Sequence, residues 1–113
     1  MHRVSNPPVA DSAALREVVR RLIDTYHPAR IYLFGSVARG DANSDSDYDL
    51  MVVVPDNAPP ELHRSRLAYE TLWGSGVAAD VLVLTVSEFE SRRHVVASLP
   101  ATVLREGKLL HAA

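Results

Sequence analysis

Hydrophobic residues recur along this chain at helical spacing in some segments and form short continuous runs in others. Between Ser12 and Pro28 the apolar positions repeat with helical spacing and arginines fall on the opposite side, which predicts an amphipathic helix of about four turns. Apolar runs at 31–34, 50–54 and 77–85 are rich in β-favouring residues. These runs predict three buried strands.

Two further helical regions are predicted after the second strand. Residues 61–73 carry apolar side chains at helical spacing, so Tyr69 and Trp73 are expected in the core, and stacking on an adenine base is their alternative role. Ser87, with Glu90 three residues later, has the spacing of a capping box. This spacing predicts the start of the last helical region.

The C-terminal region completes the predicted order of elements. Residues 88–108 are expected to be mostly helical, with a break near Pro100 and an end at Gly107. Leu109 and Leu110 then either add a short strand or pack on the core. The order helix, strand, strand, helix, strand, helix predicts an α/β fold with a small mixed β-sheet flanked by helices. The link between the first two strands leaves room for about one helical turn, which allows them to run antiparallel.

Composition and charge narrow the function classes. The 113 residues are 47% hydrophobic, and 12 basic against 14 acidic residues give a net charge of -2. This balance creates no strong field for long nucleic acid or an anionic membrane, and no apolar run approaches the roughly 20 residues that span a bilayer. The absence of cysteine excludes disulfides and thiolate metal sites. A soluble, cytoplasmic protein is expected.

The segment 35–50 carries the strongest chemical signal and begins where the first strand ends. Gly35 allows the backbone to approach a ligand closely, and the N–H groups and Ser36 hydroxyl that follow are suited to phosphate oxygens. Arg39 lies one turn further on and could reach the same oxygens. The alternatives are an ordinary turn for Gly35-Ser36 and a surface charge for Arg39.

Three aspartates predict a site for divalent cations. Asp47 and Asp49 lie two positions apart where the second strand begins, so their side chains point to one face. Two such carboxylates repel each other unless a cation lies between them, and Mg²⁺ commonly binds one or two carboxylates together with substrate phosphates. Asp80 lies in an otherwise apolar strand, where a buried unpaired carboxylate is unfavourable. If the strands are neighbours, the three acids can hold two ions for phosphoryl transfer, with Asp80 as ligand or proton acceptor.

Each acid also has a structural interpretation. The two closely spaced acids could be solvated residues that cap a strand, and Asp80 could cap a turn or pair with an arginine such as Arg30. Asp41 and Asp45 are expected to be solvated loop residues. The spacing of the five histidines does not indicate a metal site.

The same residues resemble a known signature. Gly35-Ser36, ten further residues and Asp47-Tyr48-Asp49 resemble the motif of the DNA polymerase beta-like nucleotidyltransferase superfamily. With Asp80 as the third acid, the resemblance extends over most of residues 12–110. The short chain is similar to the minimal nucleotidyltransferases, which resemble a bare catalytic domain often paired with a HEPN-domain protein. Val37 departs from the pattern, because many members carry a basic residue there.

The resemblance implies a polymerase beta palm-like fold and roles for the motif residues. It implies a single catalytic domain over residues 12–113, and the prolines at 7 and 8 disfavour helix in residues 1–11, which are expected to form a flexible leader. By this resemblance, Gly35 and Ser36 bind the triphosphate. Asp47 and Asp49 bind magnesium, and Asp80 is the third catalytic and metal-binding acid.

The resemblance also implies a reaction and a partner. Several minimal nucleotidyltransferases are antitoxins that adenylylate a tyrosine of a HEPN toxin. We therefore expect a magnesium-dependent enzyme, with two Mg²⁺ ions and ATP as the nucleotide donor, that transfers AMP to a hydroxyl of a HEPN-domain partner. The alternatives are a non-catalytic antitoxin that neutralises its partner by binding, and a small-molecule enzyme of the antibiotic-modifying kind. The latter ranks last, because 113 residues leave no room for an added acceptor domain.

Overall fold

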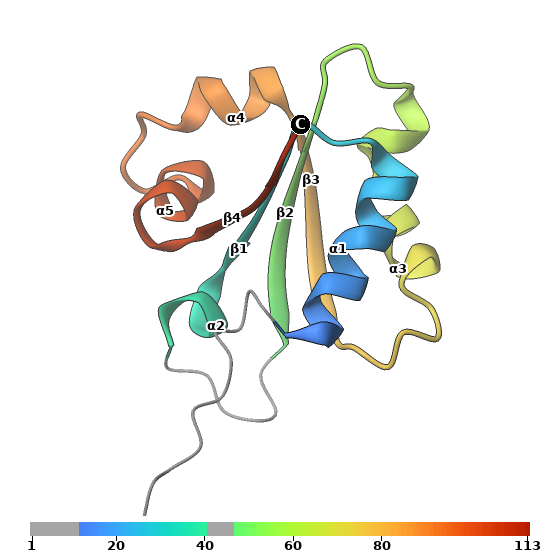
Figure 1. Cartoon of the computed structure of the whole chain (residues 1–113). Helices are drawn as coiled ribbons and strands as arrows, with labels where there is room; N and C mark the ends of the chain where they lie inside the picture. The colour runs from blue at the N-terminus through green and yellow to red at the C-terminus, as the bar shows by residue number, and fades with distance from the viewer. Residues whose placement is uncertain (1–11, 41–46) are drawn as a thin grey trace, which may run out of the picture.

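The computed structural model describes residues 12–40 and 47–113, in which helices cover both faces of a four-stranded sheet (Figure 1). The strands are β1 (Arg30–Phe34), β2 (Tyr48–Val54), β3 (Ala79–Thr85) and β4 (Lys108–Ala112). The helices are α1 (Ala13–Tyr26), α2 (Gly35–Arg39), α3 (Arg66–Thr71), α4 (Val86–Arg92) and α5 (Leu99–Glu106), and a 3-10 helix η2 (Pro60–His63) precedes α3. The predicted leader, Asp41 and Asp45 lie outside the described residues.

The sheet is mixed, with strand order β3-β2-β1-β4. β1 runs antiparallel to both β2 and β4, whereas β2 and β3 are parallel. The short helix α2 occupies the link between the first two strands, and η2 and α3 form the crossover between the parallel pair. Leu109 and Leu110 belong to β4, so they add a strand rather than only packing.

Two hydrophobic clusters enclose the sheet. On one face, α1 and α3 cover alternate residues of β2, which pack with Leu15, Val18 and Leu22 (Figure 1). On the other face, α4 and α5 contribute Phe89 and Val103 against the intervening residues of the same strand. Full burial of such a side chain is worth roughly 1.5–3 kcal/mol. Because both faces are covered, a one-residue slip of β2 would exchange every side chain between two packed layers.

Helix α1 begins and ends where the sequence predicts. The Ser12 hydroxyl is its N-cap and accepts a 3.1 Å hydrogen bond from the N–H of Leu15. His27 adopts the left-handed conformation with φ 46°, and its N–H donates to the carbonyl of Ile23. Pro28 follows and disfavours helical continuation through the preceding residue.

The single helix predicted over residues 61–73 is wrong, because the chain is extended at Arg64 between η2 and α3. The Arg64 carbonyl accepts a 2.6 Å hydrogen bond from the Tyr26 hydroxyl. The Ser65 hydroxyl accepts a 3.2 Å hydrogen bond from the N–H of Val83 in β3. The first bond satisfies the backbone carbonyl at the break and the second ties the Ser65 side chain to β3, so two short helices replace one long helix.

The prediction that Tyr69 and Trp73 lie in the core is also wrong, because they are 55% and 87% exposed. Helix α3 has six residues, and its Ala68 packs against the core beside α1. Leu72, just beyond the helix, packs against the same core. A residue one position further along a helix points about 100° away from its neighbour, so both aromatic side chains face solvent.

The capping box of α4 starts two residues earlier than predicted. The Thr85 hydroxyl accepts a 3.1 Å hydrogen bond from the N–H of Glu88, and the Thr85 N–H donates to the Glu88 carboxylate at 2.8 Å. Ser87 instead donates to the Asp56 carboxylate through both its N–H and its hydroxyl. Ser87 therefore has a tertiary partner and is not the N-cap.

The C-terminal helices are short and are bounded by the residues that the sequence indicates. Ser98 caps α5, Pro100 lies in its first turn, and Gly107 follows its last residue, so the predicted break and end are confirmed. In the part of the chain that the structure describes, no helix has the length and apolarity that crossing a bilayer requires.

Candidate active site

Parallel pairing of β2 and β3 brings two acids that are distant in sequence side by side. Asp49 and Asp80 are direct partners in the register of the two strands. Residues that pair in this way project from the same face of a sheet, here the face that carries Met51. Asp47 immediately precedes β2 and its side chain is exposed. The three aspartates therefore lie at the same end of the parallel pair.

Burial and neighbouring charge both raise the pKa of Asp49. Desolvation is the largest cause and the negative charges of Asp80 and Asp47 add to it, whereas Arg39 lowers the pKa. An ionised carboxylate in such surroundings is stabilised by a nearby cation. The electrostatics at this end of the strands therefore favour binding of positive charge.

Gly35 lies directly against one of these acids, Asp49. The preceding residue, Phe34, is the register partner of Asp49 across the antiparallel β1–β2 pair. Gly35 has φ +77°, and a Cβ built at this position would lie 2.2 Å from Oδ2 of Asp49. Both the left-handed conformation and the close approach to the carboxylate therefore require a glycine.

Ser36 and Arg39 lie on α2 beside the acids. Ser36 is partly buried in the first turn of the helix. Nη1 of Arg39 lies 3.8 Å from Oε1 of Glu106, and 45% of the Arg39 side chain is exposed. Val37 is buried in the core, so the position where related sequences carry a basic residue is a packing position here. Arg39 supplies the charge from α2 that acts on the pKa of Asp49.

Asp80 differs from the prediction in one respect, because its side chain is exposed rather than buried. β3 is an edge strand of the sheet, so the apolar neighbours of Asp80 do not enclose it. The argument from the cost of burying a carboxylate is therefore wrong for this residue. Its alternative partner, Arg30, instead lies 3.4 Å from Glu90 and stacks over the ring of Phe89.

An open pocket of about 550 Å³ lies beside the acids at the outer edge of the sheet. Its wall comprises Asp47, Tyr69, Leu72, Trp73, Asp80 and the connection 74–79. Sequence reasoning missed this wall because it assigned both aromatic residues to the core. The two glycines at 74 and 76 indicate where the helical region ends, but they do not show which way the aromatic side chains point.

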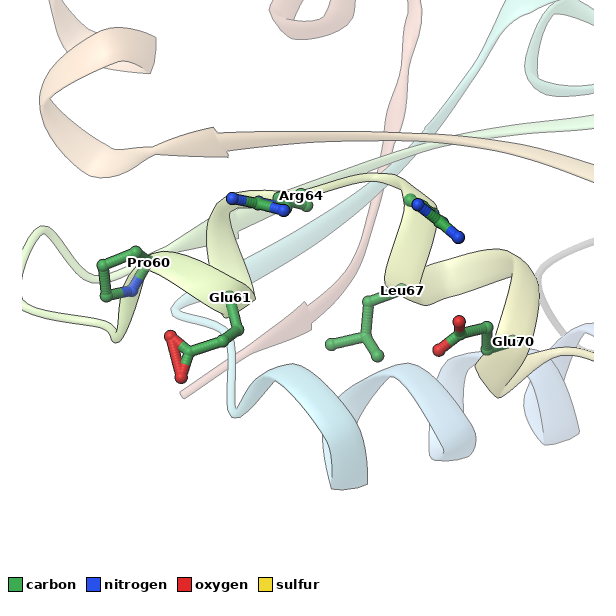
Figure 2. Close-up of a pocket in the computed structure, with 6 residues that line it drawn as sticks. Pro60, Glu61, Arg64, Leu67 and Glu70 are labelled. Carbon is green, nitrogen blue, oxygen red and sulfur yellow. The ribbon is translucent and has the colours of Figure 1, made fainter.

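A second hollow, of about 320 Å³, lies along η2 and α3. Glu61, Leu67 and Glu70 project there toward the side of α1 (Figure 2). Arg64 and a second arginine also line it, so its charges are of both signs. It contains none of the acids or phosphate-binding residues predicted from the sequence.

The acids offer oxygen donors suited to a metal. Asp47, Asp49 and Asp80 are hard ligands of one charge sign, which is the donor chemistry that Mg²⁺ prefers. Among residues 12–40 and 47–113, no group of three or more His, Cys, Asp or Glu side chains is arranged closely enough to hold a metal ion. The donor chemistry therefore fits a divalent cation, and binding would require these side chains to converge.

Comparison with known proteins assigns the fold to a family. The nucleotidyltransferase domain family matches residues 13–109, and the chain belongs to this family. A Sulfolobus solfataricus protein assigned as a nucleotidyltransferase has a similar solved structure, with a TM-score of 0.57 and 19% identity over 97% of this chain and 93% of that chain. The resemblance to nucleotidyltransferases and the predicted fold class are confirmed.

Two solved toxin–antitoxin structures are also similar. One contains AMP-PNP and has 25% identity and a TM-score of 0.50 over 86% of this chain and 73% of that chain. The other is a mutant of the MntA–HpeT pair in which two aspartates are replaced by glutamate, with 18% identity and a TM-score of 0.50 over the same 86% and 73%. A search of curated proteins found no significant match.

Proposed function

We propose that this domain transfers AMP from ATP, in a magnesium-dependent reaction, to the hydroxyl of a tyrosine in a HEPN-domain toxin. The chain would thereby act as the antitoxin of a toxin–antitoxin pair. Membership of the nucleotidyltransferase family supports nucleotidyl transfer. The similarity to a toxin–antitoxin structure that contains AMP-PNP supports an adenine nucleotide as donor and a toxin as partner.

The observation that carries the proposal is the in-register pair of Asp49 and Asp80, with Gly35 against Asp49. Stability alone explains neither feature. Like charges on neighbouring strands are destabilising, and glycine loses more conformational freedom on folding than any other residue. A site that binds cations and phosphate oxygens gives both features a reason.

Each residue then has a role in the proposed step. The acceptor oxygen bonds to the α-phosphorus of ATP, the bond from that phosphorus to the bridging oxygen of the β-phosphate breaks, and pyrophosphate leaves. Asp80 accepts the hydroxyl proton, because it is the exposed acid on β3 that an acceptor can reach from solvent. Gly35-Ser36 binds triphosphate oxygens through backbone N–H groups and the hydroxyl, and Arg39 adds positive charge. Magnesium bound by Asp47, Asp49 and Asp80 would neutralise charge on the phosphate oxygens.

Transfer of labelled AMP tests this proposal directly. The purified domain is incubated with the HEPN-domain protein, magnesium and ATP labelled on the α-phosphate. We expect the partner to acquire the label, and mass spectrometry of its peptides to place one AMP on a tyrosine. A parallel reaction with ATP labelled on the γ-phosphate distinguishes AMP transfer from phosphorylation. A folded partner that remains unlabelled in the first reaction contradicts the proposal.

A paired substitution separates catalysis from simple binding. The double variant Asp47→Ala, Asp49→Ala is expected to lose both AMP transfer and protection against the toxin, because it removes two of the three acids. Asp56→Ala, at the opposite end of β2, is the control and should keep both activities. Protection that survives in the double variant would mean that the antitoxin neutralises its partner by binding alone.

A further inference from the structure

We propose that the pocket between Asp80 and Trp73 is the acceptor subsite and that it receives a neutral or basic polypeptide segment carrying the hydroxyl. The inference rests on the proposed transfer reaction and adds the surface that selects the acceptor. Tyr69 and Trp73, the exposed aromatic residues of this pocket, are called the aromatic rim below.

The pocket lies on the side of the acids away from Gly35-Ser36. The strands follow one another across the sheet as β4, β1, β2 and β3. β1 leads into Gly35, β2 carries Asp49, and β3 carries Asp80, from which the pocket extends outward. In an in-line displacement, the attacking and leaving oxygens occupy opposite sides of the phosphorus. With the pyrophosphate at Gly35-Ser36, the acceptor hydroxyl must therefore approach from the Asp80 side.

The charge of the pocket favours a polypeptide over a nucleotide or nucleic acid. Its charged residues are Asp47 and Asp80, and no Lys, Arg or His in the described part of the chain lines it. A further hollow of about 350 Å³ on the rim is lined by Tyr69, Glu70 and Trp73, which adds another acid. Phosphate groups would be repelled by such a surface. A segment with basic and apolar side chains complements it in both charge and polarity.

The aromatic rim is exposed, but its backbone is fixed by α1. Arg21 donates hydrogen bonds to the carbonyls of Trp73 at 3.1 Å and Thr71 at 3.4 Å. The Thr71 hydroxyl donates to that of Thr25 at 3.1 Å. Trp73 nevertheless remains 87% exposed. A tryptophan held on a fixed backbone with its indole in water is unfavourable in the free domain, and tryptophan is enriched among the residues that dominate binding energy at interfaces.

The wall between the rim and the acids is fixed as well. Two glycines in the connection 74–79 adopt φ +78° and +75°. The Ser75 hydroxyl accepts a 3.1 Å hydrogen bond from the N–H of Val77. The Tyr48 N–H donates to the Ala78 carbonyl at 3.1 Å, which joins the connection to the start of β2. The pocket is therefore formed before an acceptor binds, which reduces the entropy lost on binding.

The rim carries its own spectroscopic probe, because Trp73 is the single tryptophan of the chain. Labelling the domain with 5-fluorotryptophan gives one fluorine resonance. Three unlabelled probes are titrated separately: the HEPN-domain partner, a non-hydrolysable ATP analogue with magnesium, and an oligouridylate. The inference predicts that the partner shifts the resonance and that the nucleotide and the RNA leave it unchanged.

Each other outcome of the titration overturns the inference. A shift caused by the ATP analogue would assign the pocket to the donor. A shift caused by the oligouridylate, with none caused by the partner, would assign it to nucleic acid. If the partner binds without shifting the resonance, its acceptor segment contacts another surface of the domain.

A matched pair of substitutions tests the same surface by kinetics. Trp73→Ala should raise the KM for the partner about tenfold or more, as expected for a residue that dominates an interface, and should leave the KM for ATP unchanged. Val96→Ala is the control, because Val96 is 78% exposed in the connection between α4 and α5, two helices that cover the face of the sheet opposite α3. Equal losses in the two variants, or a raised KM for ATP, would overturn the inference. If no AMP is transferred at all, the proposed reaction fails, while the fluorine titration still decides whether the rim binds the partner.

Discussion

The two ends of the parallel β2–β3 pair shift the pKa of an acidic residue in opposite directions. At the start of the strands, Asp49 is in register with Asp80, and burial and neighbouring acids raise the pKa of Asp49. Beyond the far end, Asp56 accepts hydrogen bonds from Ser87, which lower the pKa of Asp56. At the far end, Asp56 is stabilised by hydrogen bonds from within the domain, whereas the surroundings of Asp49 favour binding of an external cation.

Helix α4 extends the contrast at the far end. Glu88 completes a capping box with Thr85. Glu90 contacts Arg93 and Arg30, and these hydrogen bonds lower the pKa of Glu90. Acids that stabilise the fold thus receive hydrogen bonds from the domain itself. Asp49 differs in the direction of its pKa shift, which is upward despite the charge of Arg39, and this shift rather than the residue type distinguishes it from the structural acids.

The largest expected effect is on the rate of AMP transfer, which compares one acid from each end of the strands. Asp49→Asn removes a charge that would bind the cation, so we expect AMP transfer to fall by about 10²–10⁴-fold, in the range typical of lost catalytic groups. Asp56→Asn should leave the transfer rate nearly unchanged. Initial rates with labelled ATP and the partner measure both variants. Similar losses in the two would mean that the ends do not differ in function.

A second comparison uses two glycines that share a backbone conformation. Gly35 and Gly40 have φ +77° and +83°, so alanine is strained at either position by roughly 1–2 kcal/mol. A Cβ at Gly35 would meet Asp49, whereas at Gly40 nothing in the described structure lies within 4 Å. Both alanine variants should unfold at lower temperature. Gly35→Ala alone should lose transfer, by about a hundredfold, because a small displacement at a reacting site has that effect.

The measurement for this pair is thermal denaturation together with transfer kinetics. Gly40→Ala serves as the control for backbone strain alone. Equal transfer rates in the two variants would show that the contact between Gly35 and Asp49 does not matter for the reaction.

A smaller effect is expected from Arg39, whose side chain is 45% exposed and pairs with Glu106 at 3.8 Å. A contact between this exposed guanidinium and a phosphate oxygen is expected to contribute about 0–1 kcal/mol, as exposed ion pairs do, which corresponds to at most about a fivefold change. Arg39→Ala should raise the KM for ATP by about that factor and leave the free energy of unfolding nearly unchanged. Arg39→Lys should recover much of the loss. A variant with unaltered kinetics would reduce Arg39 to a surface charge.

The smallest expected effect is on the free energy of unfolding, which should change in opposite directions for the two ends of the strands. Measured without divalent cations, Asp56 contributes stability above its ordinary pKa of 3.8, which is lost as the pH falls through its lower folded value. Asp49 has a raised folded pKa, so its contribution is present below 3.8 and is lost as the pH rises through that folded pKa. At neutral pH, Asp49→Asn should therefore raise the free energy of unfolding and Asp56→Asn should lower it. Urea denaturation at neutral and acidic pH measures both, and changes of the same sign would contradict the assignment.

Local sequence patterns predict most elements of this fold, because these elements depend on the spacing of apolar residues and on the residues that begin or end them. The apolar period and Ser12 predict α1, and Pro55 marks the end of β2. The break at Arg64 could not be predicted in this way. It depends on hydrogen bonds from Tyr26 and Val83, which reach the break from other elements of the fold.

The candidate site divides along the same line. The strand period alone predicts that Asp47 and Asp49 share a face. The exposure of Asp80 could not be read from its apolar neighbours, because only the strand order makes β3 an edge. Likewise, capping boxes starting at Thr85 and at Ser87 fit the sequence equally well. The tertiary partner of Ser87 decides between them.

Cation binding at the start of β2 and β3 is the claim on which the rest of the account depends. Electron paramagnetic resonance of Mn²⁺, titrated with a non-hydrolysable ATP analogue present, measures that binding directly. Wild type and Asp56→Asn are predicted to bind Mn²⁺ equally well, and Asp49→Asn at least about tenfold more weakly. Unchanged Mn²⁺ affinity in Asp49→Asn would contradict the account.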